Sequence, residues 1–233
     1  MIRKTHAKGF TLMESVIAIG IVAILLTTFL AVFGPATQGI RRAISVQEAD
    51  RLIGALEREL QILRPMTDDE YGTAFEKAFE WIETSGEKDN EVFLYNYKGD
   101  PKNMRDDGTM EPYTQNGGDP GQEFILQPSV RRNGDLELEE DLEAIVGPLY
   151  YVAATQLVFN NGSLTLGTPG QIIDPHGGGP AENPDAYPEA VIAYNAQIYL
   201  MRSNTIKYVE VFDPANVEQL GRPLFSRNLA VRR

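Results

Sequence analysis

The chain has 233 residues, with 21 lysines and arginines against 33 aspartates and glutamates, a formal net charge of −12 and no cysteine. So acidic a surface repels phosphate backbones, which excludes nucleic acid as the main partner. The lack of cysteine excludes disulfides and thiolate chemistry, and the length suits one globular domain next to an N-terminal segment.

The most informative segment lies at the N-terminus. A short basic leader ends at Gly9, Phe10 follows it, and after Glu14 no charged residue occurs before Arg41. The apolar run Ser15–Phe33 is too long for the core of a secretory signal, about 7–15 residues. It has the length of a membrane-spanning helix. A plain membrane anchor is the alternative, but it does not explain Glu14, since an unpaired carboxylate near the bilayer core costs about 3 kcal/mol.

The run Gly9-Phe10-Thr11-Leu12, followed by Glu14 and an apolar helix, resembles the N-terminus of type IV pilins and of the pseudopilins of type II secretion. In that family a prepilin peptidase cuts after the glycine and methylates the new amino group. The resemblance therefore implies that residues 1–9 are a leader peptide. It also implies cleavage between Gly9 and Phe10, with Phe10 as the N-methylated first residue.

Elementary electrostatics fits this arrangement. The leader charges Arg3, Lys4 and Lys8 favour a cytoplasmic N-terminus and therefore an extracytoplasmic head. The resemblance implies that the chain is a single-pass protein of the bacterial inner membrane. Cleavage would create an amine at Phe10, and Glu14 lies one helical turn further on. A buried charge is tolerated only when it is paired. In the family the carboxylate is thought to pair with a neighbour's amine, which implies that Glu14 serves assembly. The alternative is an interfacial carboxylate favoured by the helix dipole.

The apolar helix is expected over residues 10–35, with an amphipathic continuation over 36–65. Its apolar stripe repeats at spacings of three and four, which predicts one buried helix face. The stripe consists of Val46, Ala49, Ile53, Leu56, Leu60 and Leu63. Packing on the protein's own sheet is favoured over a coiled coil, for which the stripe is short. The Gly34-Pro35 pair predicts a kink or loosening of the helix.

The remaining chain, residues 66–233, is expected to form a globular head. Expected helices are 68–84 and, less clearly, 136–146. Strands are expected at 91–97 and 123–127, followed by two hairpins, 149–159 with 163–166 and 190–201 with 205–212. Residues 227–233 are expected to be a solvated tail. The predicted fold class is α+β: a long N-terminal helix packed on an antiparallel β-sheet head, as in pilins.

Two segments rich in glycine, proline and acidic residues, at about 98–122 and 167–188, are expected to be long loops that either bind a partner or decorate the surface. Asp100, Asp106 and Asp107 are the calcium candidates in the first loop. Their spacing matches no EF-hand, and the sequence otherwise predicts no metal and no cofactor.

No catalytic motif is found: the serine elbow, the phosphate loop and zinc-ligand spacings are all absent from the sequence. The prediction is therefore a structural subunit and not an enzyme. The resemblance implies a subunit of a type IV pilus-like or type II secretion pseudopilus filament, whose partners are prepilin peptidase, other pilin subunits and the inner membrane. Many major pilins carry a proline at the position of Ala31 and a cysteine-closed loop. Their absence favours a minor, priming or tip, component. The alternatives are a major pilin and a membrane-anchored binding module.

Overall fold

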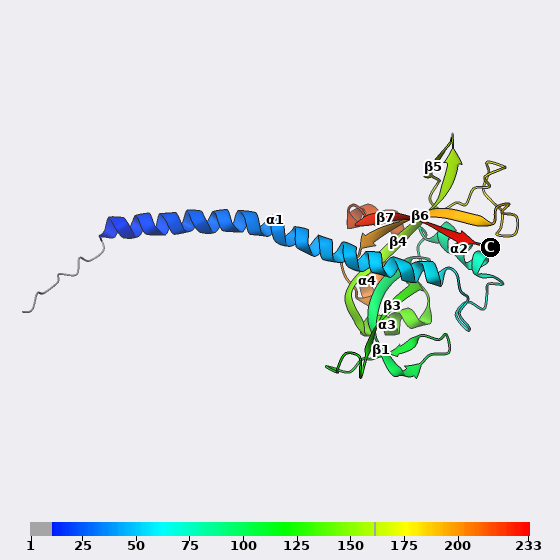
Figure 1. Ribbon diagram of the computed structural model, residues 1–233, viewed down its shortest axis with the longest axis horizontal. Coiled ribbons are helices and arrows are strands. Elements are labelled where there is room, and N and C mark those ends of the chain that lie inside the picture. Colours follow the sequence, from blue (N-terminus) through cyan, green and yellow to red (C-terminus); the bar gives the residue numbers. More distant parts are fainter. Residues whose placement is uncertain (1–10, 161) are drawn as a thin grey trace, which may run out of the picture. The chain divides into compact units, whose positions relative to one another are not determined.

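The computed structural model describes residues 11–160 and 162–233. Its first element, α1, is one uninterrupted helix from Leu12 to Glu59 (Figure 1). The chain divides into two compact units whose boundary lies within this helix, between Ile44 and Ser45. We call residues 45–233 the head unit and describe the two units separately.

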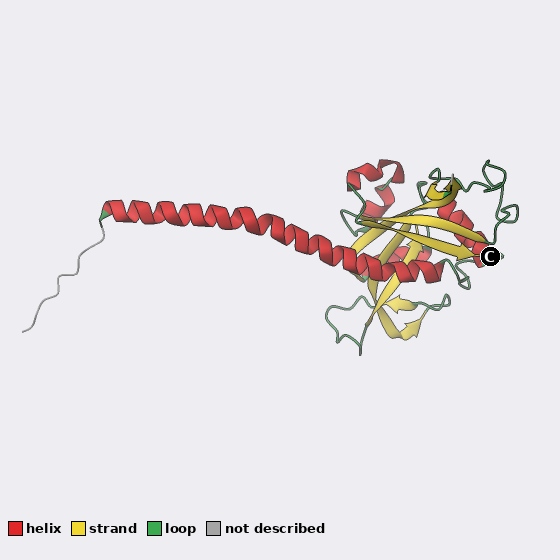
Figure 2. Cartoon of the chain, turned by 45° about the horizontal axis from the view of Figure 1, so that its top comes forward, coloured by secondary structure: helices red, strands yellow, loops and turns green. Residues whose placement is uncertain are grey.

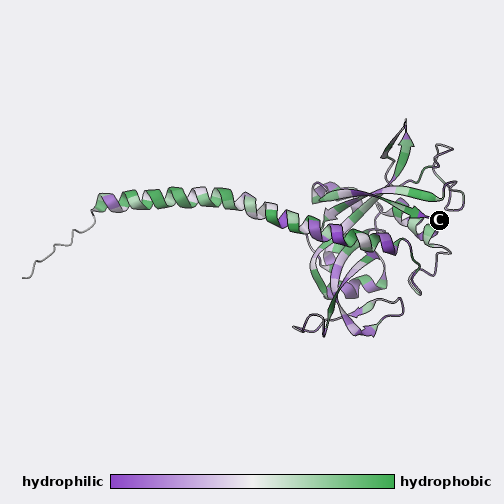
Figure 3. Ribbon diagram, viewed as in Figure 1, coloured by the Kyte–Doolittle hydropathy of each residue, from purple (hydrophilic) through white to green (hydrophobic). Residues whose placement is uncertain are grey.

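In the first unit, α1 is mostly apolar, and Figure 3 colours most of this part of the helix hydrophobic, with a hydrophilic turn near its start. At Pro35, beside which a kink or loosening is expected, α1 continues without a break. Proline removes one backbone donor from the helix. The Thr37 hydroxyl donates a hydrogen bond to the carbonyl of Gly34 at 2.9 Å, so a side chain supplements the backbone bonding beside the proline.

The head unit is built on one seven-stranded sheet in which every strand pairing is antiparallel (Figure 2). The strand order is β2-β1-β4-β6-β7, with β3 paired to β1 and β5 paired to β4. The strands are β1 (Val92–Met104), β2 (Met110–Pro112), β3 (Ile125–Arg132), β4 (Ile145–Asn160), β5 (Ser163–Leu166), β6 (Val191–Leu200) and β7 (Phe225–Arg232). A long helix followed by an antiparallel sheet confirms the α+β, pilin-like fold.

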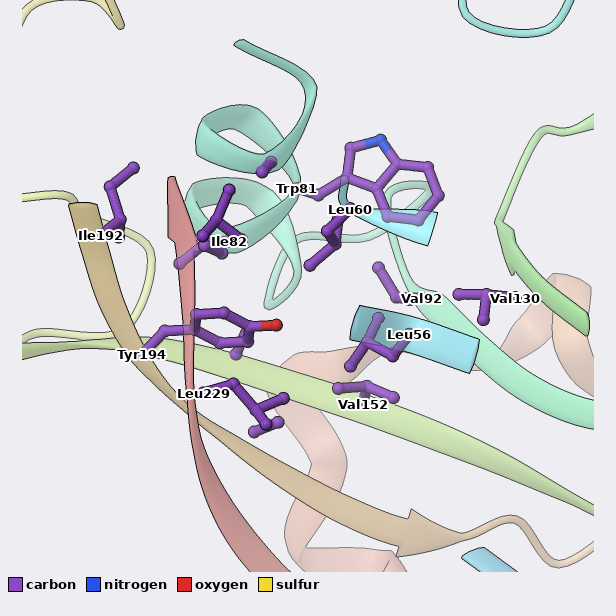
Figure 4. Packing of buried hydrophobic residues seen from close by; sticks show 14 of the residues in the cluster. Leu56, Leu60, Trp81, Ile82, Val92, Val130, Val152, Ile192, Tyr194 and Leu229 are labelled. Atoms are coloured by element: carbon purple, nitrogen blue, oxygen red, sulfur yellow. The ribbon is translucent and has the colours of Figure 1, made fainter. Parts of the chain in front are cut away.

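One core cluster joins the last part of α1 and the helix α2 (Ala74–Thr84) to the sheet. Its members from the predicted stripe are Ala49, Ile53, Leu56 and Leu60, and Figure 4 shows Leu56 and Leu60 beside Trp81 and Val152. The helix ends at Glu59, six residues before Pro65, because the chain turns at Leu60 and Gln61. Leu63 therefore lies beyond the helix and is partly exposed.

A second core cluster contains tyrosines of β1 and β4, such as Tyr95 and Tyr151. The helices α3 (Leu136–Glu143) and α4 (Ile206–Val211) contribute to it, and a 3-10 helix, Pro214–Leu220, packs against it. The helix expected around 136–146 is therefore present, although Ile145 already belongs to β4.

Two expectations for the C-terminal part are wrong. The segment expected to be the strand 205–212 contains α4 (Ile206–Val211) instead, and Val209 and Phe212 enter the second cluster. The strand beside β6 is instead β7, which contains most of the segment expected to be a solvated tail. In β7 the buried Leu229 and Val231 alternate with exposed residues, so the strand period is present in the sequence among its arginines.

Of the two segments expected to be long loops, the first is partly strand, and the second lies between β5 and β6 without a helix or strand of its own. In the first, β1 extends to Met104 and pairs with β2. The chain reverses between them at Gly108, whose φ of +79° favours glycine. In the second, the side chain of Gln156 binds both the N–H and the carbonyl of Ile173, at 2.7 and 2.9 Å, and this holds the segment against β4.

A buried ionic cluster fixes the end of α1. The ammonium of Lys77, which is fully buried, lies 2.6 Å from a carboxylate oxygen of Glu59 and 2.6 Å from one of Asp68. The guanidinium of Arg64 binds Glu59 as well, at 2.6 Å. Burial opposes ionisation of Glu59, but the hydrogen bonds and charges of Arg64 and Lys77 outweigh it and lower the pKa of this carboxyl group. The cluster connects α1, the following turn and α2.

Candidate assembly site

The residues that the sequence places at the cleavage site, Gly9 and Phe10, lie outside the described residues. The described part of the site begins at Thr11, immediately before the first helical residue, Leu12. The site can therefore be built from the start of α1 onward.

Glu14 takes part in the N-terminal cap of α1. Its Oε2 atom accepts hydrogen bonds from the backbone N–H and the hydroxyl of Thr11, both at 2.9 Å. The N–H of Glu14 donates in turn to the Thr11 hydroxyl at 3.3 Å. This reciprocal pattern is a capping box. The sequence carries the signature of this motif, because a threonine is followed three residues later by a glutamate.

After the cap, α1 presents an apolar surface on all sides. Its most hydrophobic 18-residue window has a mean hydropathy of 2.8 and none of that window is buried. By length and composition, α1 is the one helix among the described residues that could cross a membrane. An apolar surface of this size requires lipid or other apolar helices around it.

The threonine side chains within this apolar stretch form their hydrogen bonds inside the helix. The hydroxyls of Thr27 and Thr28 donate to the carbonyls of Ala23 and Ile24 at 2.8 and 2.9 Å. Since each hydroxyl has its hydrogen bond within the helix, neither requires water. Glu14 is thus the single ionisable side chain between Thr11 and Arg41.

The calcium candidates engage different partners. The carboxylate of Asp107 is buried, binds Arg131 at 2.8 Å and accepts hydrogen bonds from Thr109. Burial alone would raise its pKa, but these bonds hold the pKa below its usual value. Asp100 accepts from the N–H of Lys102, and Asp106 is exposed. Within residues 11–160 and 162–233, no three acidic or histidine side chains are grouped to hold a metal ion.

Comparison with known protein families finds a match at the N-terminus. A family model described as the prokaryotic N-terminal methylation motif matches residues 4–30. No curated protein and no solved structure matches the chain significantly. The matched segment contains the candidate cleavage residues, the capping box and most of the apolar helix surface. The N-terminus therefore carries the methylation motif of type IV pilins and pseudopilins, and the long apolar helix that follows it leads into an antiparallel sheet.

Proposed function

We propose that this protein is a structural subunit of a type IV pilus-like or type II secretion pseudopilus filament, a minor component that primes the filament or lies at its tip. The observation that carries the proposal is the methylation motif at residues 4–30. It is followed by an apolar helix whose most hydrophobic 18 residues are not buried by the rest of the chain. Such a surface suits a subunit that first resides in a membrane and then packs against the helices of other subunits.

The same proposal includes processing and location. Prepilin peptidase cuts between Gly9 and Phe10 and methylates Phe10. Before the cut, Arg3 and Lys4 keep the N-terminus cytoplasmic, so that the protein is a single-pass protein of the inner membrane with an extracytoplasmic head. The partners are prepilin peptidase and other pilin subunits, which bind through their N-terminal helices.

In the filament, Glu14 pairs with the amine of Phe10 of a neighbouring subunit. The capping box supports this role, because Oε2 of Glu14 takes both hydrogen bonds from Thr11. Oε1 receives no hydrogen bond from the described residues. The carboxylate can therefore keep its cap and accept a second charged donor when water is excluded.

The decisive experiment is mass spectrometry of the N-terminus in cells that contain a prepilin peptidase. We expect a chain that begins with N-methylated Phe10, and we expect Gly9→Ala to slow or abolish the cut. A protein that still begins at Met1 in such cells would refute the proposal.

Glu14 is tested with a matched pair of variants. Glu14→Gln keeps an oxygen that can accept from Thr11 but removes the charge, whereas Thr11→Ala removes the capping hydroxyl and keeps the charge. We expect the Glu14→Gln chain to be cleaved normally. Because loss of one partner of a buried ion pair is costly, we expect this variant to reduce the filament yield at least about tenfold. Thr11→Ala is expected to assemble. The reverse pattern would show that the cap, and not the charge, is what assembly requires.

Copy number separates the minor component from the major pilin. Quantitative mass spectrometry of purified filaments should find this chain at a small fraction of the bulk subunit. A chain that makes up most of the filament mass is a major pilin. A chain that is processed but absent from filaments is a membrane-anchored binding module.

A further inference from the structure

The buried ionic cluster at the end of α1 has the arrangement of a reaction site as well as that of an ion pair. Lys77 is fully buried, and the side chains of Glu59 and Asp68 are only 5% and 3% exposed. The Nζ atom of Lys77 lies 2.6 Å from Oδ2 of Asp68 and 2.6 Å from Oε1 of Glu59. An amine, a carboxyl group and a second carboxylate therefore meet in a place that the rest of the head shields from water.

The lysine nitrogen lies beside an electrophilic carbon. The Cγ atom of Asp68 is one C–O bond beyond Oδ2, so Nζ of Lys77 lies within about 4 Å of it. Reacting groups that are held in contact and well oriented reach effective concentrations of about 10⁵ M or more. The lysine has no alternative position in water, because it is fully buried and its ammonium lies 4.8 Å from the centre of the Trp81 ring.

Arg64 gives the two carboxyl groups different properties. Its guanidinium binds Glu59, with Nε at 3.0 and 2.9 Å from the two oxygens and Nη2 at 2.6 Å from one of them. Burial opposes ionisation of Glu59, but the hydrogen bonds and charges of Arg64 and Lys77 outweigh it and lower the pKa of this group. Glu59 is therefore held as an ion, which makes it a proton acceptor and a poor electrophile.

The carboxyl group of Asp68 receives a backbone hydrogen bond instead. The N–H of Arg64 donates to Oδ2 of Asp68 at 2.7 Å. A fixed backbone donor at this oxygen stabilises the negative charge that the oxygen acquires when the neighbouring carbon is attacked. The nucleophile, a base that a third group orients, and an oxyanion donor are thus present within one cluster.

We propose that Lys77 and Asp68 become joined by an amide bond between Nζ and Cγ, with Glu59 as the base. One ammonium proton passes to the Asp68 carboxylate, which gives an amine and a carboxylic acid. Nζ then attacks Cγ, Glu59 takes a proton from the nitrogen and returns it to the leaving hydroxyl, and one water molecule departs. The reaction changes no oxidation state and needs no cofactor. It goes beyond the function proposed above and does not depend on it.

The bond would close a ring from Asp68 to Lys77 that contains the turn before α2 and the first residues of α2. Its formation requires the fold, because the fold brings Glu59 and Arg64 to the reacting pair. A covalent bond survives unfolding of the head, whereas an ion pair does not. The two states of the cluster can therefore be distinguished in denatured protein.

The test is a digestion of the purified full-length protein, which is first allowed to fold and is then denatured. A glutamate-specific protease cuts after Glu70 and Glu76, which separates Asp68 from Lys77 unless a bond joins them. We expect the fragments 60–70 and 77–80 to remain joined, with a mass one water molecule below their sum. Fragmentation of the joined pair in the mass spectrometer should locate the bond at Asp68 and Lys77.

Two variants test the role of the base. Glu59→Gln keeps the size of the side chain and removes the proton acceptor, so we expect at least about tenfold less of the joined fragment. Asp69→Asn is the matched control, because Asp69 is exposed in the same turn and its carboxylate binds the N–H of Met66 at 3.1 Å. This control should form the joined fragment as the unsubstituted protein does. Circular dichroism shows whether Glu59→Gln folds, and the unsubstituted protein decides the proposal if it does not.

Three results overturn the proposal. Separate fragments at their full masses in the unsubstituted protein show that the cluster is an ion pair only. A bond from Lys77 to Glu59 shows that the roles of the two carboxyl groups are reversed. An equal yield of the joined fragment from folded Glu59→Gln shows that Glu59 is not the base. None of these results concerns processing at Gly9, so the proposed function is decided separately by its own experiment.

Discussion

Tyr194 shows how a single side chain can be buried at a cost. Its ring lies in the core beside Leu56 and Val152 (Figure 4). Its hydroxyl is buried and finds no hydrogen-bond partner among the described residues. Burial, followed by the charge of Glu57, raises the pKa of Tyr194, so the hydroxyl stays neutral. A neutral donor left unsatisfied still costs about 1–3 kcal/mol.

We therefore expect Tyr194→Phe to increase stability by about 1 kcal/mol, because it removes the unsatisfied hydroxyl and keeps the ring. The measurement is denaturant unfolding of the full-length protein in detergent. Tyr95→Phe is the control: the Tyr95 hydroxyl donates to Asp141 at 2.8 Å, so its removal should destabilise. A larger loss from Tyr194→Phe than from Tyr95→Phe would contradict this account.

Elements of the head are held together by charge as well as by apolar contact. Lys77 on α2 contacts Glu59, the last residue of α1, and Asp68 in the turn between the two helices. Its ammonium also lies 4.8 Å from the centre of the Trp81 ring. Glu59 and Lys77 appear in the sequence as ordinary charged helix residues. Their burial depends on how the two helices cross over the sheet, which no local pattern specifies.

Lys77→Met is expected to destabilise the protein by about 3–5 kcal/mol, since it leaves two buried carboxylates without their shared partner. Thermal unfolding followed by circular dichroism measures the loss. The exposed pair of Asp50 and Arg227, at 3.3 Å, provides the comparison. Asp50→Asn should cost less than about 1 kcal/mol. Similar losses in both variants would mean that the buried cluster contributes no more than a surface pair.

At the scale of the whole molecule, stability depends on pH because folding lowers the pKa of some carboxyl groups and raises that of others. The pKa of Glu59 and that of Asp107 are lowered in the folded state, so their contributions are present at neutral pH and are lost as the pH falls below about 4. Burial raises the pKa of Asp135 to about 6. The contribution of Asp135 to folding stability is therefore fully present below the pKa of this group in the unfolded chain, about 4, and is lost as the pH rises through 6.

Asp135→Asn should accordingly flatten the pH dependence of unfolding between pH 4 and 7. Asparagine can still accept the hydrogen bond that the N–H of Arg132 donates at 2.8 Å, but it does not ionise. We expect the melting temperature of the variant, relative to the unsubstituted protein, to rise as the pH increases from 4 to 7. Parallel curves over this range would show that Asp135 does not titrate there.

The sequence alone determined the features that depend on neighbouring residues. These include the motif from Gly9 to Glu14, the membrane-length apolar helix, most of the apolar stripe in its continuation and the β4–β5 hairpin, because helix and strand periods and turn residues act over a few positions. The capping box of Thr11 and Glu14 was predictable in the same way.

Only the tertiary structure decided which distant segments meet. The pairing of β7 with β6 left residues 206–211 to form α4, and the packing of α1 on the sheet buried Glu59 with Lys77. Such contacts join residues far apart in the chain, and their energies come from burial and pairing, which a local pattern does not encode.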